Sequence, residues 1–315
     1  MRISKLLPLI GIAIFIYLLL NIDLPKVADI LLRTSILFFS VAIVITLVDI
    51  VLKAFKWQLI FNSYSIPVKF SRFLSSWIVG LSLSMITPGK VGDFAKAYYL
   101  RDKAPLGKGL TTVMADRIID LLTLFVLAII GLSIFATMYT QDNALLITTY
   151  ALFAAFVLVI IIFSKKSIAS AILRPFYRRL VPEKKKEKLK SIYNDFYAGI
   201  GLILGKKKLL TVVVLITFLI WFGTIMVIYF ISLSLGFEIP LHFLLIVIPI
   251  ITLLEALPIS FSGVGTRDAT MIFFFGFIGI SAEASVSISL LYLLTSYIFV
   301  FIGFLIWYKN PIQRS

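Results

Sequence analysis

Two short segments combine glycine with a cation, a pairing of residue types that suits the binding of an anion. Residues 87–93 read TPGKVGD and carry Lys90, while residues 258–268 read PISFSGVGTRD and carry Arg267. Glycine lets the chain turn sharply and lets backbone N–H groups come close to a ligand. The two segments, which we call the glycine tips, therefore predict an anion site that is built from backbone donors and two positive charges.

Each glycine tip is expected to lead into a helix, which begins near Val91 in the first tip and near Thr266 in the second. The positive ends of the two helix dipoles would then point toward the same place as the cations. Asp93 and Asp268 follow closely and could partner the cations, bind an ammonium group or titrate. The alternative is that they form buried ion pairs that only hold the loops in shape. The residues assigned to the site from the tips are Pro88, Gly89, Lys90, Gly92, Asp93, Gly263, Gly265, Arg267 and Asp268.

A second group of charges stands at the mouth of an apolar helix expected over residues 118–139. Asp116 and Asp120 share one face of such a helix, and Arg117 is turned away by about 100°. Ionisable residues that enter a membrane span are costly and usually functional, although an Arg at the interface also extends its charge toward water. We interpret Asp116, Arg117 and Asp120 as inward-facing members of the site.

Two further sets of ionisable residues lie in apolar surroundings. Glu255 stands alone among Leu, Ala and Pro ahead of the second tip, so it is a functional candidate that could instead neutralise Arg267. Asp49 and Lys53 are four residues apart near the end of an apolar helix. This spacing favours an ion pair, and we interpret the pair as structural.

The composition identifies the elements that must position these side chains. The chain has 315 residues, of which 61% are hydrophobic and 14% are charged, whereas an ordinary globular domain carries about 25% charged residues. Apolar runs of about 20 residues recur along the chain, and this is the length that a helix needs to cross about 30 Å of hydrocarbon. The sequence predicts an all-α integral membrane protein and excludes a soluble enzyme.

The apolar segments have unequal lengths, which predicts two kinds of element. Six are long enough to cross the bilayer, and the short ones flank the glycine tips, so we expect six transmembrane helices and two re-entrant helical hairpins. The long segments lie near 6–22, 36–60, 118–139, 145–163, 209–235 and 286–308, and the hairpins near 73–101 and 241–280.

The distribution of Lys and Arg predicts the orientation of the chain. Cytoplasmic loops hold most of the positive charge, so both termini are expected in the cytoplasm of a multi-pass cell-membrane protein. Residues 164–208 carry thirteen Lys and Arg against three acidic residues, and we expect a cytoplasmic loop that contacts anionic lipid headgroups. The loop separates a first half, 1–163, from a second half, 209–315. The hairpins would then enter from opposite faces, as in an inverted repeat.

Several other activities lack the residues that they require. The chain has no Cys and one His, so thiolate sites and multi-histidine metal sites are excluded. No complete phosphate-binding loop motif of ATPases is present, and we expect no cofactor. The net charge of +15 reports orientation and contact with anionic lipid rather than nucleic acid. A homo-oligomer is compatible with the sequence.

In their order and spacing, the two glycine tips and the acid–Arg motif resemble the landmarks of the lysylphosphatidylglycerol synthase transmembrane family, also described as flippase-like. The likeness covers nearly the whole chain. It implies a lipid flippase fold and places the family's glycine-rich re-entrant tips and its Arg on the tips named above and on Arg117. Positions often held by Glu carry Asp93, Asp116 and Asp268 here, so the reach of each acid is shorter. The soluble aminoacyl-transferase domain of related resistance factors is missing, and we do not expect this chain to charge lipids with lysine.

The sequence therefore predicts a transporter that moves an anionic or aminoacylated phospholipid between leaflets, with a phosphate-bearing lipid as its partner. One alternative is a membrane enzyme or accessory subunit that acts on polyprenyl-phosphate lipids with Mg²⁺ bound by Asp side chains. Another is a scaffold that recruits a soluble transferase through residues 164–208.

Overall fold

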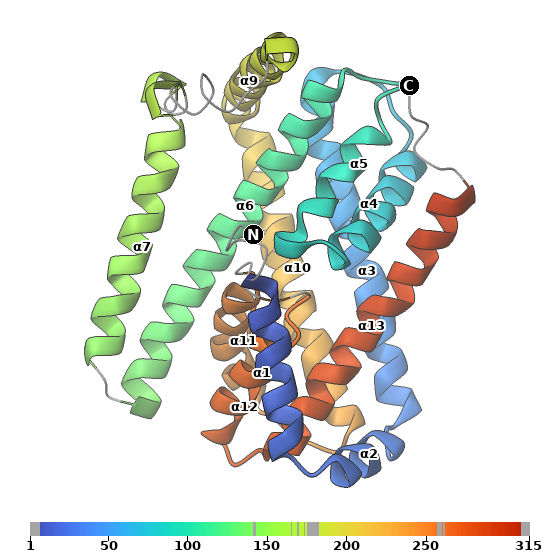
Figure 1. Cartoon of the computed structure of the whole chain (residues 1–315), viewed down its shortest axis with the longest axis vertical. Coiled ribbons are helices and arrows are strands. Elements are labelled where there is room, and N and C mark those ends of the chain that lie inside the picture. The colour runs from blue at the N-terminus through green and yellow to red at the C-terminus, as the bar shows by residue number, and fades with distance from the viewer. Residues whose placement is uncertain are drawn as a thin grey trace.

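A computed structural model describes residues 7–140, 143–164, 166–168, 170–172, 174, 183–256, 260 and 262–309. Within these ranges the chain is helical and forms no strand, so the predicted all-α class is confirmed (Figure 1). The helices are α1 (Leu7–Asn21), α2 (Leu24–Leu32), α3 (Ile36–Phe61), α4 (Phe70–Met85), α5 (Ala95–Tyr98), α6 (Leu106–Phe135), α7 (Asn143–Ser164), α9 (Glu183–Leu204), α10 (Lys207–Ser234), α11 (Leu241–Glu255), α12 (Thr266–Gly276) and α13 (Ala282–Lys309).

Four helices, α3, α6, α10 and α13, are long and apolar enough to cross a membrane. A fifth crossing results if α1 and α2, which meet at an angle of 92°, count as one bent span. The segment predicted over 145–163 corresponds to α7, several of whose side chains lie outside the described residues. The count of six spans stays a prediction.

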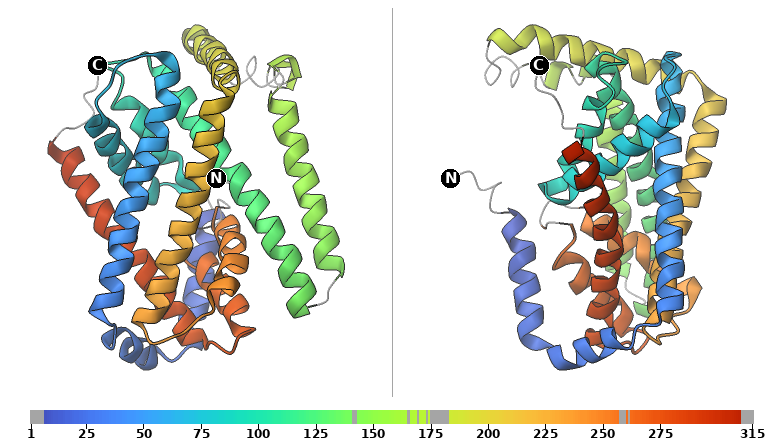
Figure 2. Two further views of the ribbon diagram at one scale, coloured as in Figure 1. Left: turned by 180° about the vertical axis from the view of Figure 1, so that it is seen from behind. Right: turned by 90° about the vertical axis from the view of Figure 1, so that its right-hand side faces the viewer.

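Two stretches outside the predicted spans and hairpins contain helices. Leu24–Leu32 form α2, because Asp23 accepts a hydrogen bond from the backbone N–H of Lys26 at 3.1 Å and Pro25 occupies the first turn. The basic stretch 164–208 contains α9, which lies across one end of the bundle (Figure 2). Helix α2 has only nine residues and α9 begins with a run of charged residues, so a search for long apolar runs detects neither helix. We call the two ends of the bundle the α9 end and the α2 end.

Helix α6 begins at Leu106, twelve residues before the predicted start at 118. Asp116, Arg117 and Asp120 therefore lie about three turns inside a long helix and not at its mouth. The apolar run begins later than the helix because Lys108 and the acid–Arg motif interrupt the hydropathy without breaking the helix.

The first hairpin enters from the α9 end with α4 and returns through a 3₁₀ segment, Pro88–Phe94, and the single turn of α5 (Figure 1). No α-helix starts near Val91, so the expected dipole is missing from this tip. Pro88, Gly89 and Gly92 are poor α-helix formers, and the tight 3₁₀ geometry suits a short return. Gly92 also lies against the backbone of Leu83, where a β-carbon would collide.

The second hairpin enters from the α2 end with α11 and returns through α12, which begins at Thr266 as predicted. Gly263 and Gly265 have φ angles of +78° and +84°, a left-handed conformation that side chains rarely adopt. Gly265 also approaches the backbone of Gly11 on α1 so closely that no β-carbon would fit. Helix α1 thus packs against the second tip.

The long helices pack in three pairs that bring the two hairpins into one bundle. Helix α3 lies along α10, α6 lies along α11, and α4 lies along α13 (Figure 2). Gly131 of α6 faces the backbone of Ile246 on α11, and Gly303 of α13 faces the backbone of Ile78 on α4. Small residues let membrane helices approach closely, so a glycine stands at each of the two hairpin contacts.

Candidate functional site

Six charged side chains gather between α3, the first hairpin and α6. Lys56 comes from α3, Asp93 from the end of the 3₁₀ segment and Lys96 from α5, while α6 supplies Asp116, Arg117 and Asp120. We call this group the ionic cluster. The structure thus brings together the acid–Arg motif and the acid of the first tip, and it adds two lysines that the sequence interpretation missed.

The ionic cluster is a continuous chain of short contacts. Lys96 Nζ lies 3.0 Å from Asp93 Oδ2 and 3.3 Å from Asp116 Oδ2. Lys56 Nζ lies 3.0 Å from Asp116 Oδ1 and also contacts Asp120. Arg117 Nε donates to Asp93 Oδ2 at 2.7 Å. Asp116 therefore joins the two lysines, while Asp93 joins Lys96 to the arginine.

Burial divides the ionic cluster into a closed side and an open side. The side chains of Lys56, Lys96, Asp93 and Asp116 are at most 4% exposed, whereas that of Arg117 is 36% exposed. Three cations face three carboxylates, so the group is neutral as a whole, which limits the cost of burying it. Arg117 is the member best placed to meet a ligand.

The missed lysines differ in how far a local signal could have identified them. Lys96 follows Asp93 by three residues, a spacing that permits contact within one turn, and its ammonium lies 5.2 Å above the Trp57 ring. Lys56 meets acids that are sixty or more residues away in the chain. Only the packing of α3 against α6 creates that contact.

At the second tip, Arg267 is buried and its donors are engaged. Its Nε donates to Ser289 Oγ at 2.8 Å, and its Nη1 donates to the carbonyl of Ser262 at 3.3 Å. Glu255 Oε2 lies 3.9 Å from Nη1, which agrees with the neutralising role considered for Glu255. The guanidinium also lies 5.2 Å above the Tyr292 ring.

The backbone donors of both tips are also used within the protein. Asp268 accepts a hydrogen bond from the N–H of Gly265 at 2.7 Å and thereby caps α12 instead of pairing with Arg267. Gly92 N–H donates to Thr87 Oγ1 at 2.7 Å. The side chains of Pro88, Gly89 and Lys90 lie outside the described residues, as do residues 257–259 and 261.

The two hairpins meet although they enter from opposite ends. Ser262 Oγ, in the second tip, donates to the carbonyl of Met85 at the end of α4 at 2.8 Å. A polar cavity of about 70 Å³ lies among α3, α4, α10 and α13, and it contains Asp49, Lys53 and Tyr292 in its wall. Tyr292 adjoins Arg267 of the second tip, and Lys53 precedes Lys56 of the ionic cluster by one turn of α3. Polar groups therefore extend from the second tip toward the ionic cluster beside the first hairpin.

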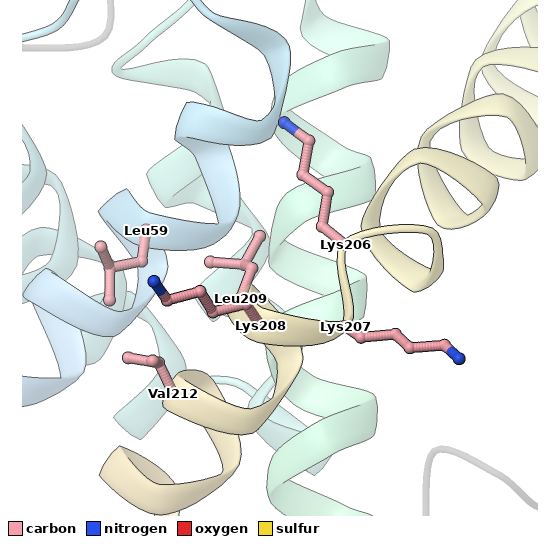
Figure 3. Close-up of a pocket in the computed structure, with 6 residues that line it drawn as sticks. All are labelled: Leu59, Lys206, Lys207, Lys208, Leu209 and Val212. Carbon is pink, nitrogen blue, oxygen red and sulfur yellow. The ribbon is translucent and has the colours of Figure 1, made fainter.

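A basic hollow of about 530 Å³ lies at the α9 end, where α9 leads into α10. Leu59, Leu209 and Val212 form its apolar wall, and three consecutive lysines border it (Figure 3). Lys206 Nζ donates to the carbonyl of Ser63 at 3.1 Å, Lys207 points away, and Lys208 extends toward Leu59. Among the residues that the structure describes, no group of three or more His, Asp or Glu side chains could hold a metal ion.

Comparisons with known proteins identify the family. The family described as the lysylphosphatidylglycerol synthase TM region matches residues 6–303. A UPF0104 membrane protein of Methanothermobacter thermautotrophicus is 25% identical over 309 residues, which cover 93% of this chain and 91% of the relative. One from Pyrococcus horikoshii is 24% identical over 309 residues, with 93% and 92% covered. No solved structure matches the chain. The family match and the apolar helices together show a multi-pass membrane protein that belongs to the lysylphosphatidylglycerol synthase transmembrane family.

Proposed function

We propose that the protein is a lipid flippase that moves an anionic or aminoacylated phospholipid between the two leaflets. The observation that carries this proposal is the meeting of the two hairpins at Ser262 and Met85, with buried ionic side chains on both sides of the contact. Broken helices that meet near the midplane and ionisable residues at membrane depth are recurrent features of transporters. Membership of the family adds independent support.

In this proposal the headgroup passes along the polar groups while its acyl chains stay in lipid. Arg117 is the entry contact, because its guanidinium is partly exposed and remains anchored through Asp93. The second glycine tip borders the other half of the path, and Arg267 holds this tip in place through the carbonyl of Ser262 and the hydroxyl of Ser289. The acids set the headgroup preference, since an aminoacylated lipid presents an ammonium group in addition to its phosphate.

We also propose that the two halves form an inverted repeat that exchanges access between the leaflets. Helices α3, α4 and α6 run opposite to α10, α11 and α13, each to its counterpart in that order, and the exchange of one set for the other preserves the pairings among these six helices. Gly131 and Gly303 then occupy corresponding contacts. A repeat of this kind lets an outward-open conformation interconvert with the inward-open one that a two-fold axis in the membrane plane relates to it.

The α9 end is proposed to face the cytoplasm of the cell, with both chain termini on that side. Lys186 and Lys190 of α9 and the basic hollow at Lys206–Lys208 lie at this end, as the rule for cytoplasmic loops requires. Anionic headgroups are the expected contacts, because they attract basic residues next to the bilayer. We propose that the chain is a transporter and does not itself charge lipids.

A liposome assay tests the proposal. Purified full-length protein is reconstituted into vesicles with a fluorescent phosphatidylglycerol, and a membrane-impermeant quencher reports how fast the probe moves between leaflets. We expect the protein to accelerate exchange over empty vesicles, and Arg117→Gln to slow it. Lys103→Gln is the matched control, because Lys103 is exposed at the α9 end. Equal rates with and without protein for phosphatidylglycerol and its lysyl ester would refute the proposal, and Mg²⁺-dependent turnover of a polyprenyl phosphate would favour the enzyme alternative.

A further inference from the structure

The polar cavity that has Asp49, Lys53 and Tyr292 in its wall lies among four helices of the bundle. Helices α3, α4, α10 and α13 each contribute to its wall, and we call it the central chamber. Its volume of about 70 Å³ has room for several water molecules. Its lining residues are Thr46, Asp49, Ile50, Lys53, Trp77, Leu81, Thr224, Val227, Tyr292, Thr295, Ser296 and Phe299.

The threonine hydroxyls of the chamber donate their hydrogen bonds to backbone carbonyls of their own helices. Thr46 Oγ1 donates to the carbonyl of Ala42 at 2.8 Å, and Thr295 Oγ1 donates to that of Tyr292 at 2.7 Å. Thr224 Oγ1 donates to the carbonyl of Ile220 at 3.1 Å and reaches Asp49 Oδ2 only at 3.5 Å. The hydroxyls therefore turn lone pairs toward the chamber and satisfy its carboxylate poorly.

Asp49 is consequently a buried acid with little compensation. It is 5% exposed, and within the described part of the chain it forms no ion pair. Its Oδ1 lies over Gly223, where any β-carbon would collide with the carboxylate. A carboxylate at this depth needs a proton, water or a cation from the chamber.

Lys53 is the cation of the chamber, and it differs from the other cations of this region. Each of the other four described cations, Lys56, Lys96, Arg117 and Arg267, has a carboxylate within ion-pair distance. Lys53 has none among the described residues, and its ammonium lies 5.8 Å from the Trp77 ring. Asp49 is the acid that shares the chamber with it.

We propose that Asp49 binds and releases a proton, and that its protonation turns Lys53 into a binding site for the phosphate of a lipid headgroup. The inference rests on the proposed flippase function. One proton enters from the bulk solvent and binds the Asp49 carboxylate, which becomes a neutral acid, while Lys53 remains an ammonium ion. The chamber then changes from neutral to a charge of +1, and a phosphate with one negative charge restores neutrality. Proton and headgroup therefore enter and leave together.

The groups that face Asp49 from each neighbouring helix favour this exchange. Helix α3 presents Lys53, helix α10 presents Thr224 and helix α13 presents the phenol of Tyr292, whereas Trp77 and Leu81 of α4 carry no charge. Behind these lie two neutral groupings, the Arg267–Glu255 pair at the ring of Tyr292 and the ionic cluster that begins at Lys56. No second carboxylate in the described wall shares the proton.

A fluorescence experiment tests the chamber without any measurement of transport. Trp77 lies beside Lys53, so the difference between the emission of the wild type and of Trp77→Phe reports on the chamber. In detergent, this difference is expected to change in one titration step between pH 4 and pH 9. Asp49→Asn should abolish the step, and Asp29→Asn, which alters an exposed acid paired with Arg33, should retain it. A step that persists in Asp49→Asn overturns the proposal.

Binding of a phosphate-bearing probe tests the role of Lys53. Dihexanoyl phosphatidylglycerol is expected to bind the wild type at least 10-fold more tightly at pH 5 than at pH 8, and to bind Asp49→Asn equally at both. Lys53→Gln should weaken binding at pH 5 at least 10-fold, and Lys53→Arg should restore it. Inorganic phosphate is the headgroup-only arm, and equal affinity for both probes would identify free phosphate rather than lipid as the ligand. Binding without pH dependence, or unchanged in Lys53→Gln, overturns the proposal.

Vesicles with a pH gradient separate this inference from the flippase proposal. We expect an acidic interior or exterior to bias lipid movement in the wild type, and Asp49→Asn to move lipid without that bias. If the wild type moves lipid but ignores the gradient, the proton inference fails and the flippase proposal stands. If no lipid moves, the flippase proposal fails, and the Trp77 titration still decides whether Asp49 takes up a proton.

Discussion

Removal of Lys96 is the sharpest test of the buried ionic cluster. The side chain of Lys96 is 0% exposed. The substitution Lys96→Met keeps the length of the aliphatic chain and deletes the ammonium group. Asp93 and Asp116 then lose contacts of 3.0 and 3.3 Å. Three carboxylates would face two cations, and two of these carboxylates, Asp93 and Asp116, are at most 4% exposed.

The expected loss of stability follows from this burial. The loss of one partner of a buried ion pair costs about 3–5 kcal/mol, because the remaining charge stays desolvated. Lys96 serves two carboxylates and both of these are buried, so we expect a value in the upper part of that range. Arg117→Met should cost only about 1 kcal/mol, because its side chain is 36% exposed and Asp93 retains Lys96.

A second substitution distinguishes lost charge balance from lost packing. Lys96→Met combined with Asp116→Asn leaves two complete pairs, Asp93 with Arg117 and Lys56 with Asp120. We expect the double variant to recover about 1–3 kcal/mol relative to Lys96→Met, a coupling typical of residues in contact. In the control combination of Lys96→Met with Asp29→Asn, the losses of unfolding free energy should be additive.

Unfolding in increasing mole fractions of dodecyl sulfate, followed by tryptophan fluorescence, measures these free energies. A Lys96→Met protein as stable as the wild type would refute the reasoning, since the lysine would then be dispensable for the neutrality of the cluster. Additive losses in Lys96→Met with Asp116→Asn would refute it as well, because they would show that the side chains act through packing alone.

Three further outcomes are expected in the same unfolding assay. Gly303→Ala should cost about 1–3 kcal/mol, because its β-carbon would press on the backbone of α4, whereas Gly276→Ala, which has open space around it, should be within about 0.5 kcal/mol of the wild type. Ser262→Ala removes the hydrogen bond to the carbonyl of Met85 and should cost about 1 kcal/mol, and an unchanged stability would mean that the hairpins do not depend on this contact. Gly265→Ala should cost at least about 1–2 kcal/mol from its φ of +84° alone and should accelerate proteolysis of α1, which it would push away from the tip.

The sequence predicted the features that depend on local chemistry. The positive φ angles at Gly263 and Gly265 belong to a residue type that adopts them freely, and the start of α12 at Thr266 follows directly after them. Asp116 and Asp120 meet a common partner, Lys56, because a four-residue spacing places them on one helical face. Such features need no knowledge of the tertiary structure.

Features that depend on distant contacts could not be read in the same way. Lys56 resembled any other lysine near the end of an apolar helix until packing placed it against α6. Arg267 was expected to offer its charge to a ligand, but Ser289 and the carbonyl of Ser262 occupy its donors. Helix α2 escaped detection because it is short, and α9 because its first half is charged and hydropathy reports the solvent around a helix and not its backbone.

The neutrality of the buried charges has a consequence for transport. Lys56, Lys96 and Arg117 balance three carboxylates, and Arg267 lies beside Glu255, so these groups can remain in the membrane without attracting an anion strongly. A site that is neutral at rest admits an anionic headgroup only if one of its charges can be changed without unfolding the protein. Within the described residues, the carboxylate that meets this condition is that of Asp49, which borders the central chamber, lacks an ion pair and shares its space with the unpaired Lys53. Neutral clusters therefore hold the helices together, and the central chamber is where the charge of the interior can vary.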